Sequence, residues 1–141
     1  MNSKIVLILV LFSVLFIAGC TQTEQTTSGS IKIGLMGPLT GDAAVYGIPY
    51  KNMVESAVGE INAEGGINGR KIELIVEDSK CSGMDGATTA QKLIAVDKVQ
   101  VILGGMCSSE SLGAEPVATQ NKVFLFSAGS SSPALTGKSR F

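Results

Sequence analysis

The chain has 141 residues and carries 11 lysines and arginines against 12 acidic residues, so neither a basic surface for nucleic acid nor an acidic tail is evident. It contains no histidine, which removes the commonest general base and the commonest metal ligand together. These features argue against a nucleic-acid partner, a metal site and histidine-dependent catalysis.

The first thirty residues have the layout of an export signal. A short positive start ending at Lys4 precedes an apolar run over residues 5–18, interrupted only by Ser13, and small residues lead to Cys20. The run is shorter than the roughly 20 residues of a transmembrane helix. We expect residues 1–19 to be a signal peptide and residues 20–30, polar after the cysteine, to be a flexible tether.

The letters "IAGC" resemble the lipobox of lipoprotein precursors, in which a cysteine is lipidated and becomes the new N-terminus. This resemblance implies that a lipid on Cys20 anchors the protein to the outer face of the cytoplasmic membrane, or in the periplasm, as its only membrane contact. An ordinary secretory signal with an incidental cysteine is the alternative, and both predict export.

From residue 31 onward, β-branched runs alternate with helical patterns of apolar residues. Strands are predicted at residues 31–36, 71–78, 99–105 and 122–129, and helices at residues 49–63, 84–96 and 109–121. Pro49 suits the first turn of its helix, and Pro133 suits the start of another short one. The run at residues 99–105 is typical of a strand buried on both faces. This order predicts an α/β fold with an open parallel sheet and helices on both faces.

Three predicted strand ends carry Gly- and Ser-rich stretches, namely "MGPLTG", "GGMCSS" and "SAGSSS". Ligands of open parallel sheets bind outside the carboxyl ends of the strands. Free N–H groups at a helix start and a serine hydroxyl can hold a carboxylate, while carbonyls and a second hydroxyl can accept from an ammonium. The composition of this edge therefore suits a zwitterion.

The stretches "GPLTG", "INAEGGINGRKIEL" and "CSS", in this order and spacing, resemble the extracytoplasmic branched-chain amino acid binding proteins of ABC transporters. The resemblance covers residue 31 to about residue 136. It implies the type I periplasmic-binding-protein fold, whose two α/β lobes close on an amino acid, and an ABC transporter permease as partner. The chain ends at Phe141 directly after a predicted strand, so we expect residues 31–141 to be a partial N-terminal lobe.

The resemblance also implies roles for single residues. Ser108 matches the serine that binds the ligand carboxylate, and Ser109 follows it at the helix start; capping of the helix is the alternative role. Gly129 falls where the family offers a carbonyl to the ligand ammonium. Ser131 falls where a threonine hydroxyl is usual, a change that keeps the hydroxyl and removes a methyl.

Tyr46, expected just ahead of the first helix, matches an aromatic residue of the ligand side-chain pocket, and packing on its own helix end is the alternative. Met106 is a second pocket candidate, although a buried strand-end methionine is as ordinary. Cys81 and Cys107 match a disulfide of the family. A closed loop of about 27 residues would stabilise the fold by roughly 3.5 kcal/mol in the chain-entropy account.

Two rival functions start from the same strand end. Cys107 as a nucleophile would need an activating base, and "MCSSE" is not the G-x-S-x-G elbow of a hydrolase. "GGMCSS" lacks the lysine of a phosphate-binding loop, so we expect neither an enzyme nor a cofactor. A ligand-sensing receptor domain for amino acids, amides or urea-like solutes remains an alternative, because one fold serves several functions.

Overall fold

The structure is a computed structural model, and it describes residues 29–138. The predicted signal peptide, Cys20 and most of the tether lie outside the described residues. The elements in chain order are β1 (Ile31–Gly37), α2 (Ala44–Ala63), β2 (Ile72–Asp78), α3 (Gly83–Ala95), β3 (Val101–Gly104), α4 (Ser108–Gln120), β4 (Phe124–Phe126) and the 3₁₀ helix η2 (Pro133–Leu135). Across residues 29–138, every helix is too short or too polar to span a membrane.

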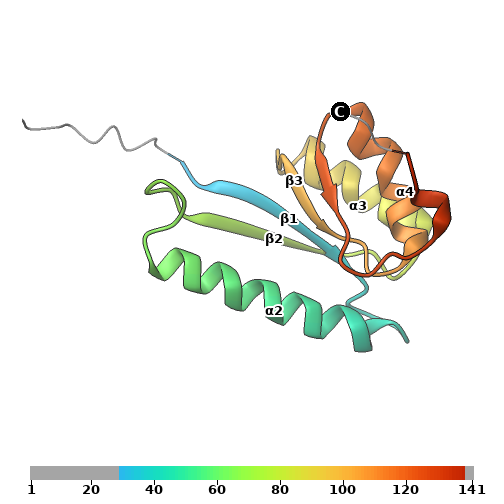
Figure 1. Cartoon of the computed structure of the whole chain (residues 1–141), viewed down its shortest axis with the longest axis horizontal. Coiled ribbons are helices and arrows are strands. Elements are labelled where there is room, and N and C mark those ends of the chain that lie inside the picture. The colour runs from blue at the N-terminus through green and yellow to red at the C-terminus, as the bar shows by residue number, and fades with distance from the viewer. Residues whose placement is uncertain (1–28, 139–141) are drawn as a thin grey trace, which may run out of the picture.

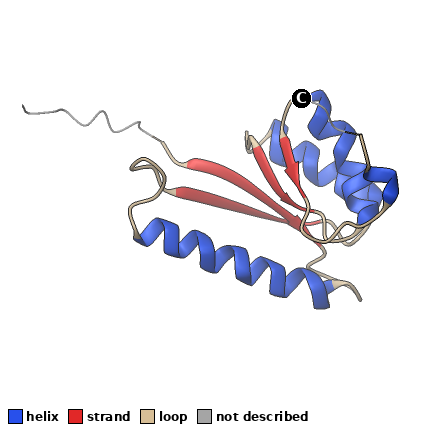
Figure 2. Cartoon of the chain, in the orientation of Figure 1, coloured by secondary structure: helices blue, strands red, loops and turns tan. Residues whose placement is uncertain are grey.

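The four strands form one parallel sheet in the order β2-β1-β3-β4. Helix α2 covers one face of the sheet, while α3 and α4 cover the other (Figures 1 and 2). The predicted α/β fold, with an open parallel sheet between helices, is therefore confirmed. All four strands point their carboxyl ends toward one edge, which is the edge where the Gly- and Ser-rich stretches lie.

Alternation along β1 builds a core on each side of the sheet. Met36 joins Leu93, Ile102 and Ala114 under α3 and α4, whereas Leu35 joins Tyr50 and Val54 under α2. Neighbouring side chains of a strand point to opposite faces, so one apolar run can serve both cores. The two layers hold β1 rigidly at the centre of the sheet.

The start of α2 differs from the prediction. The helix begins at Ala44, so Pro49 lies inside it and Tyr46 lies in its first turn instead of ahead of it. Gly47 allows this first part of the helix to pack closely on the loop after β1, because a Cβ on this residue would be 1.8 Å from the Pro38 carbonyl oxygen. The first turn of α2 is therefore held by close contact with the loop after β1. Nothing in the local sequence reports that contact.

The other elements exist as predicted, with smaller differences at their ends. Helix α4 accommodates Gly113 because this residue lies against α3, where a Cβ would be 1.9 Å from the Gly83 carbonyl oxygen. Strand β4 is only three residues long, since the chain turns at Ser127 to bond with the loop after β3. Strand β3 is not buried on both faces, because Val101 and Leu103 are half-buried on the α2 side.

Candidate functional site

The loops after β3 and β4 meet at Ser108, the first residue of α4. Its Oγ accepts hydrogen bonds from the backbone N–H of Ser131 at 3.2 Å and of Ser132 at 3.1 Å. These two bonds use the acceptor capacity of the hydroxyl, which retains one O–H to donate. Among the described residues, no protein group accepts that O–H. The Ser108 hydroxyl can therefore donate to solvent or to a ligand.

Ser109 lies next to Ser108, but its side chain has a different use. The Ser109 Oγ donates to the Cys81 carbonyl oxygen at 2.6 Å and so ties α4 to the loop after β2. The N–H groups of Ser108 and Ser109 belong to the first turn of α4, where no carbonyl of the same helix can accept from them. Ser109 can thus offer a backbone N–H at the helix start, not its hydroxyl.

The loop after β4 is folded by Ser127. Its Oγ donates to the Gly105 carbonyl at 2.6 Å and accepts from the N–H groups of Gly129 at 3.3 Å and Ser130 at 2.9 Å. Gly129 lies close to the chain at Met106, because a Cβ there would be 2.8 Å from the Met106 carbonyl oxygen. The structure therefore brings Ser108, Ser131, Gly129 and Met106 to one edge.

Ser130 and Ser111 form a contact that the sequence did not reveal. Their hydroxyl oxygens are 2.7 Å apart, and Ser130 Oγ also donates to the Gly105 carbonyl at 2.9 Å. Ser130 therefore links the loop after β4 both to α4 and to the loop after β3. The one signal in the sequence was the pair of glycines at the end of β3, since a Cβ on Gly105 would be 2.2 Å from the Ser111 Oγ.

The two candidate pocket residues have different surroundings. Met106 is half-buried and packs against the Leu35, Tyr50 and Val54 cluster, between this core and the Gly129 loop. Tyr46 is 66% exposed in the first turn of α2, so it does not pack on its own helix end. Within the described chain, no hydrogen bond links Tyr46 to the other candidate residues.

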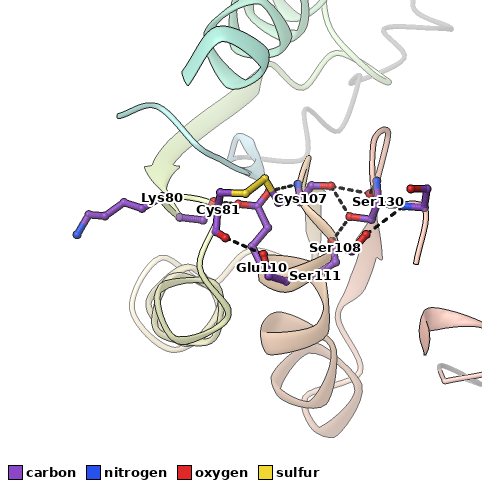
Figure 3. Close-up of a disulfide and its surroundings, with 12 residues drawn as sticks. Lys80, Cys81, Cys107, Ser108, Glu110, Ser111 and Ser130 are labelled. Carbon is purple, nitrogen blue, oxygen red and sulfur yellow. Dashed lines mark hydrogen bonds between the residues drawn. A yellow bond between two sulfur atoms is a disulfide. The ribbon is translucent and has the colours of Figure 1, made fainter. Parts of the chain in front are cut away.

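Cys81 and Cys107 form a disulfide in the structure, with Cα atoms 5.3 Å apart (Figure 3). Cys107 directly precedes α4, and Cys81 lies in the loop after β2 with a left-handed φ of 59°. The disulfide and the Ser109 hydrogen bond both attach the start of α4 to the loop after β2. Cys107, the residue before Ser108, is therefore attached covalently to the loop after β2.

Glu110 lies behind this edge and was not singled out from the sequence. It is completely buried; its Oε1 accepts from the Cys107 N–H at 2.8 Å, and its Oε2 accepts from the Ser79 hydroxyl (Figure 3). An acidic residue three positions after a helix N-cap often returns to the N-cap N–H, as in a capping box. That spacing in "CSSE" was the available signal, although cysteine is not the usual N-cap residue.

The loop after β1 is held by Asp78, the last residue of β2. Its carboxylate accepts from the N–H of Leu39 at 2.8 Å, from the N–H of Lys80 at 3.0 Å and from the Thr40 hydroxyl. Partial burial raises the pKa of Asp78, but the hydrogen bonds from Thr40, Leu39 and Lys80 outweigh it, so the pKa lies below its ordinary value of 3.8. The folded chain thus favours the charged form.

Replacement of Asp78 should change how stability depends on pH. A carboxyl with a lowered pKa in the folded state contributes stability that is fully present above its ordinary pKa and is lost as pH falls through the folded value. We expect the Tm of the Asp78→Asn variant to be lower than that of the parent at pH 7 and the difference to shrink between about pH 5 and pH 2. Thermal unfolding followed by circular dichroism measures this, with exposed Asp42→Asn as control. Parallel Tm curves for parent and Asp78→Asn would contradict the assignment.

The edge that carries Ser108 is open. A hollow of about 320 Å³ lies beside it between α4, β4 and η2, and Ser111, Ser127 and Ser130 contribute to its wall. The predicted ligand residues Ser108, Gly129 and Ser131 are not among its lining residues and therefore lie outside this hollow.

Comparisons with known proteins agree with this architecture. Residues 30–141 match the family described as periplasmic binding protein. The Leu/Ile/Val-binding protein homolog 2 of Brucella abortus is 33% identical over 111 residues, which are 79% of this chain and 30% of that protein. The chain thus spans about a third of the length of the relatives it matches.

Two solved structures show the same fold with different ligands. The branched-chain amino acid transporter substrate binding protein of Streptococcus pneumoniae, in complex with isoleucine, has a TM-score of 0.73 and 34% identity, covering 76% of this chain and 31% of that one. The solute binding protein of an ABC transporter from Rhodopseudomonas palustris, in complex with 3,4-dihydroxy benzoic acid, has a TM-score of 0.70 and 33% identity, covering 78% and 30%. The family match over residues 30–141, together with the parallel sheet, confirms the sequence resemblance: the chain belongs to the periplasmic binding protein family.

Proposed function

We propose that this chain supplies the first-lobe side of an extracytoplasmic solute-binding protein of an ABC transporter, which binds a branched-chain or related amino acid for import. The observation that carries the proposal is the state of Ser108. Its Oγ already accepts from the Ser131 and Ser132 N–H groups, so it can only donate. The ligand atom that meets it must be an acceptor, such as a carboxylate oxygen.

The start of α4 reinforces this choice of ligand group. The N–H groups of Ser108 and Ser109 lie at the positive end of the helix dipole, which favours an anion. A carboxylate oxygen bound by the Ser108 hydroxyl can also accept from these N–H groups. No charged side chain of this lobe is needed for that part of the site.

The ammonium of an α-amino acid would lie on the loop after β4. The Ser131 N–H is 3.2 Å from the Ser108 Oγ, so the Ser131 hydroxyl and the Gly129 carbonyl belong to the segment that touches the carboxylate donor. The carboxylate and ammonium of an α-amino acid are separated by a single carbon. Two adjacent subsites, one for an anion and one for a cation, suit this spacing. Tyr46 and Met106 would contact the ligand side chain from this lobe.

The complex of the Rhodopseudomonas palustris protein favours a second ligand class. Its 3,4-dihydroxy benzoic acid has a carboxyl group and no ammonium. An aromatic carboxylate could therefore use the Ser108 subsite and leave the Gly129 subsite to a water or a hydroxyl. A titration with isoleucine and with dihydroxybenzoate decides between the two classes.

The proposed context follows from the family. Members are extracytoplasmic, which agrees with the export signal expected at residues 1–19. We propose that Cys20 carries a lipid, that residues 20–30 are the tether and that residues 31–141 belong to the first lobe. The hinge, the second lobe and the rest of the ligand side-chain pocket would complete the site, and a permease would receive the ligand.

Substitution of Ser108 by alanine tests the site. In the complete, ligand-binding form of the protein, we expect Ser108→Ala to raise the Kd for isoleucine about 10- to 100-fold, because a hydrogen bond to a charged group contributes about 1.5 to 3 kcal/mol. Isothermal titration calorimetry measures the Kd. Isoleucinamide, whose neutral carbonyl accepts more weakly, should show a smaller effect of the same substitution.

Ser56→Ala, an exposed change on α2, is the control and should leave the Kd unchanged. A Kd for isoleucine that stays within about twofold of the parent value in Ser108→Ala would reject the Ser108 assignment.

A further inference from the structure

A buried carboxylate lies directly behind the proposed carboxylate site. Glu110 is 0% exposed, and it takes part in none of the ion pairs found among residues 29–138. A buried acidic side chain without a positive partner is costly unless hydrogen bonds satisfy its oxygens. Hydrogen bonds from Cys107 and Ser79 satisfy the two carboxylate oxygens of Glu110.

The two oxygens of Glu110 join segments that are distant in the sequence. One oxygen accepts from the backbone N–H of Cys107, which belongs to the Met106–Cys107 peptide, one residue before Ser108. The other takes the hydroxyl of Ser79, the residue after β2. Because the carboxylate uses the Cys107 N–H, the N–H groups of Ser108 and Ser109 are the ones left at the helix start.

Glu110 is closely packed at its side-chain Cγ and at its backbone carbonyl. A Cβ on Gly105 would be 2.8 Å from the Glu110 Cγ, and a Cβ on Gly86 would be 2.4 Å from the Glu110 carbonyl oxygen. Gly105, in the loop after β3, thus lies close to the Glu110 side chain, and Gly86 on α3 lies close to the Glu110 backbone. Because Glu110 is closely packed, its hydrogen bond fixes the position of the Cys107 N–H. Ser108 is the next residue in the chain, so its position is restrained as well.

We propose that Glu110 is a positioning residue for the ligand-binding turn. By holding the Cys107 N–H against the end of β2, it sets the direction in which α4 begins, and it thereby places the Ser108 Oγ on the N–H groups of Ser131 and Ser132. Its consequence for affinity rests on the proposed function, whereas its effect on the turn does not.

Glutamine separates positioning from charge. In Glu110→Gln, the amide oxygen can accept from the Cys107 N–H while the amide nitrogen donates to the Ser79 Oγ, so both contacts persist without a charge. Glu110→Ala removes both contacts. Glu110→Asp, one methylene shorter, cannot reach both partners and serves if the alanine variant does not fold. Glu115→Ala is the matched control, because within residues 29–138 this carboxylate on the same helix accepts a hydrogen bond from Thr119 alone.

Amide hydrogen exchange measured by NMR on the full, disulfide-bonded chain tests the proposal. In Glu110→Ala or Glu110→Asp, we expect exchange of the Cys107, Ser131 and Ser132 amides to become at least about tenfold faster relative to the amides of β1 and α2. Glu110→Gln should restore the three rates to within about threefold of the parent, and Glu115→Ala should leave them unchanged. Uniform acceleration throughout the chain, unchanged Ser131 and Ser132 rates, or failure of glutamine to restore them would overturn the proposal.

An isoleucine titration in the complete ligand-binding form distinguishes this inference from the proposed function. We expect Glu110→Gln to bind isoleucine within about threefold of the parent and Glu110→Asp to bind at least about tenfold more weakly. Equal affinities for Glu110→Asp and the parent would overturn the effect on binding. If the parent itself bound no amino acid or carboxylate, the proposed function would fail, and the exchange rates would still decide whether Glu110 positions the turn.

Discussion

The Cys81→Ala/Cys107→Ala double variant is expected to lose about 3.5 kcal/mol of unfolding free energy relative to the oxidised parent, the value that the chain-entropy account assigns to a closed loop of this length. The two cysteines are 26 positions apart, and the loop between them contains all of α3. Without the cross-link, the unfolded chain gains conformational freedom and the folded edge loses the tie between the β2 and β3 ends. Urea denaturation followed by circular dichroism measures the loss.

Reduction supplies the control for this experiment. The parent chain in dithiothreitol should lose the same free energy as the double variant, whereas the double variant should not respond to dithiothreitol. Equal urea midpoints for oxidised parent, reduced parent and double variant would show that the disulfide does not stabilise the fold.

The second large effect is expected in the core under α3. Leu93 is fully buried, and Leu93→Ala should cost about 2 to 5 kcal/mol, since it removes buried methyl groups and leaves a cavity. Gly34 on β1 lies directly opposite, where a Cβ would be 2.9 Å from the Leu93 Cδ1 and 3.1 Å from the Cδ2. Gly34→Ala should therefore cost about 1 to 3 kcal/mol by overpacking.

The two substitutions should compensate each other. In Gly34→Ala/Leu93→Ala, the new methyl group enters the space that the leucine leaves, so the loss should be at least about 1 kcal/mol smaller than the sum of the single losses. Two matched controls are available: Met84→Ala on exposed α3 surface should change stability by less than about 0.5 kcal/mol. Gly59→Ala on α2, where a Cβ meets nothing within 4 Å, should stabilise by about 0.4 to 1 kcal/mol. Strictly additive losses at positions 34 and 93 would contradict the packing described here.

The ligand roles of Ser108, Gly129, Ser131, Tyr46 and Met106 remain predictions, but the structure shows which of them are compatible with their surroundings. The hydroxyl of Ser109 is engaged with Cys81, so only its backbone N–H is available. Tyr46 lies inside α2, whose first part packs closely on Pro38 at Gly47, a contact that no local pattern could report. Sequence reasoning predicted that the Gly- and Ser-rich strand ends share one edge of the sheet, which the structure confirms. It erred at the start of α2, where one backbone packs closely on another.

The sequence by itself determined the order of strands and helices, the parallel sheet and the family. Apolar periodicity reports which face of each element avoids water, and this local signal survives without knowledge of the partner element. Only the tertiary structure decided which polar groups meet at the strand ends. Ser79 and Glu110 are 31 residues apart, and Ser108 and Ser131 are 23 apart, so their hydrogen bonds exist only because parallel crossovers return each strand to the same edge. A hydrogen bond tolerates deviations of only a few tenths of an ångström in its donor–acceptor distance. The packing of the layers sets that distance, and the spacing of residues along the chain does not.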